Sequence, residues 1–293
     1  MVFWAFSFIW YKIANQSFRP ITIVFIRLVI SVIILLSYLT IKRKFVTIRK
    51  KDRRLFVMLA LFEPFMYFIG ESFGLTYVSA TVGSVVISTI PVVATVGAWI
   101  AFRERLRVVN YAGILISFIG ILIFILNRNG SLSFSTKGLL LLILAVFSAV
   151  GYNLTLSRLV GLYSPAFIVT VQNLIGATLF LPLFLLFDFR ELAGNPFIFR
   201  SFIPILELAV FASCGAFILF AFSVRKIGIT RANVFTNFIP VLTAIFSFII
   251  IGDKVTFQNI AGMIVVLAGI FMSQLNGRPK KTEDALVLTG KTA

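Results

Sequence analysis

The chain contains ten long apolar segments separated by short polar stretches. A helix of about 20 apolar residues crosses the hydrocarbon core of a bilayer, which is roughly 30 Å thick. Helices and closed barrels are the structures that satisfy their own backbone hydrogen bonds in lipid. We therefore expect an all-α polytopic membrane protein with ten transmembrane helices, in contact with the lipid bilayer. The expected spans are 1–18, 20–41, 55–76, 80–102, 108–126, 137–157, 166–187, 201–222, 230–251 and 258–275.

The composition agrees with a membrane protein and leaves no room for a soluble domain. Of the 293 residues, 60% are hydrophobic and 13% charged, whereas about 25% of the residues in a soluble domain are charged. A net charge of +17 would suggest nucleic acid as the partner of a soluble protein. In a membrane protein, basic residues gather in cytoplasmic loops and set the orientation. We therefore expect no nucleic-acid partner.

The basic residues also predict the orientation of the chain. Most of the 27 Lys and Arg residues lie in alternate loops, above all in residues 42–54, 103–107 and 225–231 and in the tail. The positive-inside rule then places both termini in the cytoplasm. Two basic residues fall inside expected spans. Lys12 lies near a helix end and can extend to the interface, whereas Arg27 lies about two turns into its helix.

Two halves of the chain resemble each other. Residues 77–123 align without a gap with residues 226–272, and the identical pairs include Pro91/Pro240, Asn110/Asn259, Gly113/Gly262 and Gly120/Gly269. Each half holds five spans, an odd number, so the second half must enter the membrane in the opposite orientation. We expect a 5+5 inverted repeat with one unit at 1–126, a second at 137–275 and a polar cytoplasmic tail at 276–293. Such repeats bind substrate near the midplane, where the halves meet; an old duplication kept for packing is the alternative.

The paired glycines have a simpler interpretation. Gly113 and Gly120 are seven residues apart and share a helix face, as do Gly262 and Gly269. Small residues on one face let a neighbouring backbone approach closely in a membrane. We expect these glycines to mark tight helix packing.

Three carboxylates fall inside expected spans: Glu63 and Glu71 in the third, and Glu207 in the eighth. A charge at bilayer depth costs a few kcal/mol or more, so such residues point into the bundle or an aqueous cavity and are functional candidates. We take all three as candidates for proton coupling, with Glu71 first. A structural pair with Arg27 is the alternative for Glu71. Glu207 is equally open to a buried pair, an inner-face group or a proton carrier.

Pro91 and Pro240 interrupt the backbone hydrogen bonding in the middle of corresponding helices. A proline in mid-span frees a carbonyl and permits a kink where the helix lines a cavity. We interpret both prolines as hinges, with plain packing kinks as the alternative. Polar and aromatic side chains near them and in other spans offer hydrogen bonds and apolar or cation–π walls. The predicted substrate-binding residues are Glu71, Trp10, Tyr67, Ser88, Thr89, Tyr152, Asn153, Thr236 and Asn237.

The residues that the chain lacks argue against an enzyme. It contains no histidine, which excludes a Ser-His-Asp triad, an HExxH zinc site and a His-ligated haem. It has no Gly-rich phosphate loop, and its single cysteine, Cys214, cannot form an internal disulfide. We expect no enzymatic activity, no metal site and no cofactor.

Four motifs occur in the order found in one transporter family. Residues 4–8 read Trp-Ala-Phe-Ser-Phe, where the family usually has Trp-Gly-x-x-Phe, and residues 71–80 are similar to its Glu-Asn-x-Ala-Leu-x-Tyr-Thr-Ser-Ala. Pro91 and Pro240 lie in mid-helix, and residues 103–106 match a Gly-Glu-Arg-Leu turn apart from Arg103. Over nearly its whole length the chain resembles the drug/metabolite transporter superfamily, of the ten-span EamA type.

The resemblance implies secondary transport of small organic metabolites across a bacterial inner membrane. In that family the usual activity is export of amino acids or related compounds by alternating access around a central cavity, and the protein would be a monomer or a homodimer. Ala5, Arg103 and the pair Asp253-Lys254 depart from the pattern. A passive channel and a non-transporting membrane scaffold are the alternative functions.

Overall fold

The computed structural model describes residues 1–94, 108–125, 135–194, 199–253 and 256–274, and all regular structure in these ranges is helical. Within these ranges, six helices are long and apolar enough to cross a membrane, and four shorter apolar helices accompany them. The chain is therefore an all-helical polytopic membrane protein, while the count of ten spans stays a prediction. The turn at 103–106 and the tail at 276–293 lie outside the described residues.

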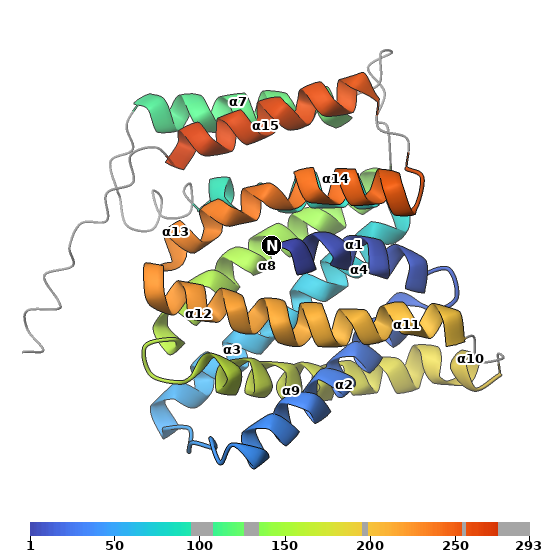
Figure 1. The fold of residues 1–293 in the computed structure, drawn as a ribbon, viewed down its shortest axis with the longest axis vertical. Helices are drawn as coiled ribbons and strands as arrows, with labels where there is room; N and C mark the ends of the chain where they lie inside the picture. Colours follow the sequence, from blue (N-terminus) through green and yellow to red (C-terminus); the bar gives the residue numbers. More distant parts are fainter. Residues whose placement is uncertain (95–107, 126–134, 195–198, 254–255, 275–293) are drawn as a thin grey trace, which may run out of the picture.

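The elements follow one another as a helical bundle (Figure 1). Their bounds are α1 Val2–Ala14, α2 Pro20–Ile41, η1 Lys50–Asp52, α3 Arg53–Ala60, η2 Leu61–Met66, α4 Tyr67–Tyr77, α5 Ala80–Ile87, α7 Val108–Ile125, α8 Thr136–Leu159, α9 Pro165–Leu183, η3 Phe184–Asp188, α10 Phe189–Gly194, α11 Phe199–Glu207, η4 Leu208–Ala216, α12 Phe217–Ile227, α13 Ile229–Val234, η5 Phe235–Phe238, α14 Ile239–Ile250 and α15 Phe257–Gln274. Apart from η1 and η5, which are 3₁₀ turns, the η elements are π-helical stretches within longer helices.

The third expected span is not one regular helix. It runs through α3, η2 and α4, and Glu63 inside η2 has the non-helical dihedrals φ −146° and ψ 117°. The next residue, Pro64, has no N–H to donate, so the hydrogen-bond ladder cannot continue through it. The break turns the helix at the depth where Glu63 lies.

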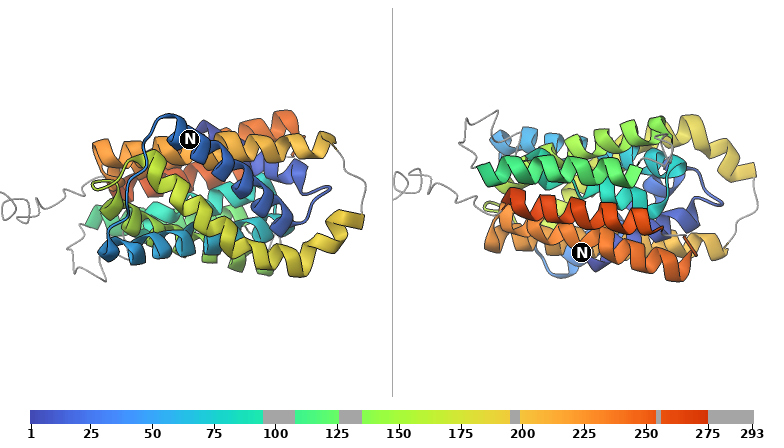
Figure 2. Two further views of the ribbon diagram at one scale, coloured as in Figure 1. Left: turned by 90° about the horizontal axis from the view of Figure 1, so that it is seen from below. Right: turned by 90° about the horizontal axis from the view of Figure 1, so that it is seen from above.

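The helices pack in pairs that join the two halves of the sequence. α2 lies along α9, α4 along α8, and α1 contacts α14, α11 and η4. α7 and α15 form a separate pair at one edge of the bundle, and the right-hand view of Figure 2 shows them side by side over the other helices. A small apolar cluster of Val85, Val92, Val266 and Ile270 joins α15 to α5 and to the residues beyond it.

Glycines set the contact between α7 and α15. A Cβ atom on Gly113 would lie 2.7 Å from the Gly269 carbonyl oxygen, and one on Gly120 would lie 2.9 Å from a backbone atom of Val265. Such distances are shorter than carbon atoms tolerate, so the two backbones meet directly, as the heptad spacing of the glycines predicts. Asn110 adds a hydrogen bond from its side-chain amide to the Ser273 carbonyl at 2.8 Å.

Replacing Gly113 by valine is expected to lower the melting temperature of the detergent-solubilised protein. The added side chain must push α15 away, and overpacking of this kind costs about 1–3 kcal/mol. Gly161→Val is the matched control, because a Cβ on Gly161 meets no atom within 4 Å. Equal melting temperatures for the two variants would contradict the tight packing.

Side chains of α1 hold α4 in place. The Tyr11 hydroxyl donates to the Ser72 carbonyl at 2.7 Å, and the Lys12 ammonium donates to the Leu75 carbonyl at 2.6 Å. Leu75 lies in the last turn of α4, where carbonyls lack helical partners. Lys12 therefore caps a neighbouring helix. The sequence predicted only that its side chain extends to the membrane interface.

Candidate functional site

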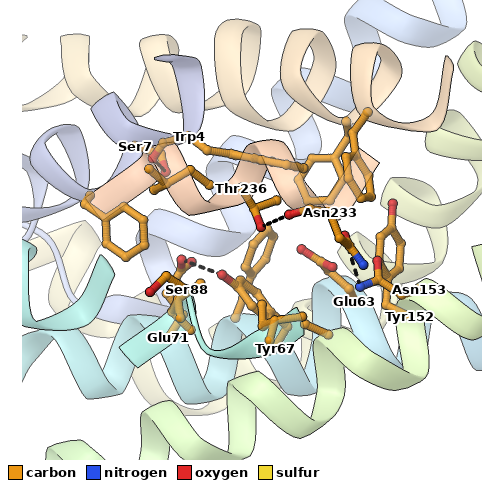
Figure 3. A pocket seen from close by; sticks show the side chains of 18 of the residues that line it. Trp4, Ser7, Glu63, Tyr67, Glu71, Ser88, Tyr152, Asn153, Asn233 and Thr236 are labelled. Atoms are coloured by element: carbon orange, nitrogen blue, oxygen red, sulfur yellow. Dashed lines mark hydrogen bonds between the residues drawn. The ribbon is translucent and has the colours of Figure 1, made fainter. Parts of the chain in front are cut away.

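A pocket lies in the interior of the bundle, between elements of both halves of the chain. Its cavity volume is about 70 Å³, which is room for several water molecules. Its walls come from α1, α2, η2, α4, the end of α5, α8, α12, α13, η5 and the start of α14. Figure 3 shows the side chains that converge on it.

Glu71 lies at one end of the pocket, beside Ser88 (Figure 3). Tyr67, one turn earlier on α4, donates a hydrogen bond from its hydroxyl to Glu71 Oε1 at 2.9 Å. Glu71 is 8% exposed, so this carboxyl group is almost entirely removed from solvent. The α4 helix thus presents a carboxyl group that is held by a phenol and faces the pocket.

Arg27 reaches the same pocket from α2. Its guanidinium donates from Nε to the Ser213 hydroxyl at 3.0 Å and lies 4.0 Å from the ring centroid of Phe68. Asn173 strengthens this anchor by donating to the Ser213 carbonyl at 3.1 Å and to the Ser31 hydroxyl at 2.9 Å. A network joining α2, α9 and η4 therefore fixes the guanidinium, and its side chain is part of the pocket lining.

Glu63 lies at the helix break, toward the other end of the pocket (Figure 3). It is 6% exposed, and among the described residues its carboxyl group has neither a hydrogen bond nor an ion pair within 4.0 Å. Arg27 acts on it electrostatically from a greater distance. Glu63 and Glu71 thus line one pocket at different depths.

Amides and hydroxyls form the polar part of the remaining wall. The Asn153 amide donates to Asn233 Oδ1 at 3.5 Å, and the Thr236 hydroxyl donates to the Asn233 carbonyl at 2.6 Å. The Ser88 hydroxyl donates to the Val85 carbonyl at 2.7 Å. The buried Tyr152 hydroxyl, in contrast, lies beside the Gln172 amide of α9 and has no other partner in the described part of the chain.

Aromatic rings form the apolar wall. Trp4 on α1 lies 5.4 Å from Phe217 and 5.1 Å from Phe220, measured between ring centroids. Tyr152 meets Phe217 edge to face at 6.1 Å. The rings are steeply tilted to one another, at interplanar angles of 59°, 81° and 89°. Ring contacts of this kind are stabilising and give the pocket an apolar wall.

The structure brings most of the sequence-predicted residues into this pocket and leaves four candidates outside it. Glu63, Glu71, Tyr67, Ser88, Tyr152, Asn153 and Thr236 line it. The Trp10 ring instead stacks on Phe6 and makes a tilted contact with Phe211, at centroid distances of 5.3 Å and 5.7 Å. The Thr89 hydroxyl donates to the Val86 carbonyl of its own helix. Asn237 and Glu207 also lie outside the lining, and Glu207 is the last residue of α11.

The two prolines lie where helices resume. The turn at Ser88 and Thr89 ends α5, and the chain is helical again over residues 90–94, which include Pro91. Pro240 lies in the first turn of α14, which begins directly after the 3₁₀ turn η5. Both corresponding helices are therefore interrupted beside the pocket, and the hinge role of the prolines stays a prediction.

Sequence reasoning left several lining residues out of the predicted site. Trp4 and Ser7 belong to the aromatic motif at residues 4–8, and this motif was the signal that could have placed them. Phe217 and Phe220 gave no signal, because the chain contains 34 phenylalanines. Arg27 and Asn233 stood out only as polar residues within spans.

Comparisons with known proteins agree with this architecture. The model of the EamA-like transporter family matches residues 1–126 and again residues 136–275. An uncharacterized transporter of Archaeoglobus fulgidus is 25% identical over 93% of this chain and 95% of its own length. The uncharacterized transporter YetK of Bacillus subtilis is 26% identical over 88% of this chain and 78% of its own.

A solved crystal structure shares the fold. It superposes with a TM-score of 0.67 at 13% sequence identity and covers 93% of this chain and 97% of its own. Two matches to one family model, with the relatives aligned over almost the full length, assign the chain as a whole. The protein belongs to the EamA-like transporter family and is a multi-pass membrane transporter.

Proposed function

We propose that the protein is a secondary transporter that exports small organic metabolites, such as amino acids, across a bacterial inner membrane by alternating access. One observation carries the proposal: a pocket lies inside the bundle, is built by both halves of the chain, and contains carboxyl groups. Ionisable groups buried within membrane-spanning segments mark substrate or ion pathways. The protein acts as a monomer or a homodimer and is not an enzyme.

The same proposal includes the 5+5 inverted repeat with both termini in the cytoplasm. The helix contacts support it. α2 packs on α9 and α7 on α15, and these are the second and fifth segments of each half paired with their counterparts. The third segment of each half contacts the first segment of the other, as α4 with α8 and η4 with α1. A twofold relation between the halves produces this pattern of contacts.

Substrate movement is coupled to protons through Glu71, with Glu63 as the second carboxyl group of the pocket. Both are buried side chains that face the same space. Glu207 lies outside the pocket, so a coupling role for it has less support. Pro91 and Pro240 act as hinges at the two corresponding helix interruptions.

The test is counterflow in proteoliposomes. Liposomes preloaded with an unlabelled compound are diluted into a trace of its labelled form, for a panel of amino acids and amines. A carrier produces transient accumulation of label above equilibrium, because its two sides open in turn. A channel gives equilibration without an overshoot, and a scaffold gives no flux with any compound; either result would contradict the proposal.

A further inference from the structure

The charges of the pocket do not balance. Within the described part of the chain, its charged lining residues are Arg27, Glu63 and Glu71. All three are at most 8% exposed. With each group in its ionised form, one positive charge faces two negative charges. A carboxyl group in a membrane interior is stabilised either by a proton or by a cation. The carboxyl group that Arg27 does not offset therefore has a proton and a cationic ligand as alternative partners.

The charge of Glu71 offsets the charge of Arg27. Glu71 is the acidic residue that acts most strongly on Arg27. Each side chain is also held by a neutral partner, Arg27 by the Ser213 hydroxyl at 3.0 Å and Glu71 by the Tyr67 hydroxyl at 2.9 Å. These anchors keep the opposite charges in fixed places within the pocket. Among the described residues no ion pair within 4.0 Å joins them, so Glu71 offsets the guanidinium from across the pocket and not by direct contact.

Glu63 is the carboxyl group of the pocket that has no direct partner among the described residues. Its carboxyl group has no hydrogen bond or ion pair among the described residues, and the helix break places it on the side of Asn153 and Tyr152 (Figure 3). Further polar groups lie nearby. The buried Tyr152 hydroxyl lies beside the Gln172 amide, and neither group has another hydrogen-bond partner among the described residues. A buried, unsatisfied group costs about 1–3 kcal/mol, so a ligand that supplies its partner gains affinity.

The walls beside Glu63 suit a cation with an apolar body. Trp4, Phe217 and Phe220 pack together at centroid distances of 5.1–5.4 Å and line the pocket. The face of an aromatic ring attracts an ammonium group, and Trp does so best. The same rings offer apolar surface to the apolar part of a ligand.

From this arrangement we propose that the pocket selects monocationic organic amines with an apolar, preferably aromatic, body, and that Glu63 binds their ammonium group. The inference rests on the proposed transport function, and within its class of small organic metabolites it favours amines over amino acids. A zwitterionic amino acid would add a third carboxyl group to a site whose one guanidinium already faces Glu63 and Glu71. A monocation brings the sum of the four charges to zero.

Three probes with the same ring and different head groups test the proposal. These are 2-phenylethylamine, a cation; phenylalanine, a zwitterion; and 3-phenylpropionate, an anion. Binding is measured by isothermal titration calorimetry on the full-length protein in nanodiscs at pH 7. We expect the amine to bind at least about tenfold more tightly than phenylalanine, and the anion to bind most weakly. Equal or tighter binding of phenylalanine would overturn the proposal.

Variants of Glu63 test whether this residue causes the preference for the amine. Glu63→Gln is expected to weaken binding of 2-phenylethylamine at least about tenfold, whereas Glu63→Asp keeps the charge and the order of the probes. Glu207→Gln is the matched control, since it neutralises an intramembrane carboxyl group outside the pocket. Unchanged amine binding in folded Glu63→Gln contradicts the assignment. If that variant does not fold, loss of the amine preference in Glu63→Asp contradicts it instead.

Counterflow with the same probes separates this proposal from the transport function itself. Counterflow of phenylalanine without counterflow or binding of the amine overturns the substrate class and leaves the carrier function standing. Tight amine binding without counterflow of any probe supports Glu63 as the ammonium site and overturns the carrier function.

Discussion

Glu71→Gln is expected to reduce pH-driven accumulation of substrate in proteoliposomes to the level of protein-free liposomes. Glutamine has the size of glutamate and keeps an oxygen that can accept the Tyr67 hydrogen bond, seen at 2.9 Å in the native protein. It cannot bind or release a proton, so a cycle that depends on proton movement at this position stops. The measurement is uptake of labelled substrate with and without an imposed pH gradient.

Glu207→Gln serves as the control for this experiment. Glu207 is also a carboxyl group within a membrane-spanning helix, but it does not line the pocket. We expect its variant to retain the pH response of the native protein. If Glu71→Gln shows the same dependence of transport on pH as the native protein, Glu71 is not the coupling group.

Arg27→Leu is expected to cause the largest loss of stability among single changes at the site. It leaves the buried carboxyl groups of Glu63 and Glu71 without their positive neighbour and removes the hydrogen bond to Ser213. Breaking a buried charge pair by removing one partner costs about 3–5 kcal/mol. The measurement is the free energy of unfolding in mixed detergent micelles.

A double variant shows whether the loss comes from charge. Arg27→Leu combined with Glu71→Gln removes both members of the pair, and we expect it to be more stable than Arg27→Leu alone. Additive effects would mean that the two groups do not interact. Arg27→Lys keeps the charge but cannot reproduce both the Nε hydrogen bond and the stacking on Phe68, so an intermediate stability is expected.

The helical architecture could be predicted from the sequence because lipid imposes a simple rule on apolar length. Each expected span contains helical residues in the structure. The rule says less about irregular geometry. The break at Glu63 had a signal in Pro64, but the π-helical stretch of η4 contains no proline. Its form depends on packing between helices, which hydropathy does not record.

The candidate site was predictable where a polar group was rare. Carboxylates within spans are costly, so Glu63 and Glu71 could be singled out without a structure. Trp10 shows the limit of this reasoning. It lies on the same helix as Trp4, but six residues further along a helix with 3.6 residues per turn it points in another direction. Which tryptophan faces the pocket depends on the rotation of α1, which its neighbours determine.

The helix interruptions make the bending stiffness of the bundle uneven. A regular helix resists bending along its whole length, whereas a break in the i→i−4 hydrogen bonds concentrates bending at one point. The breaks at Glu63, at Ser88 and at η5 all border the pocket, while α2 runs unbroken over 22 residues and α7 meets α15 backbone to backbone. Bending of the helices therefore requires the least energy beside the pocket and the most at the α7–α15 edge.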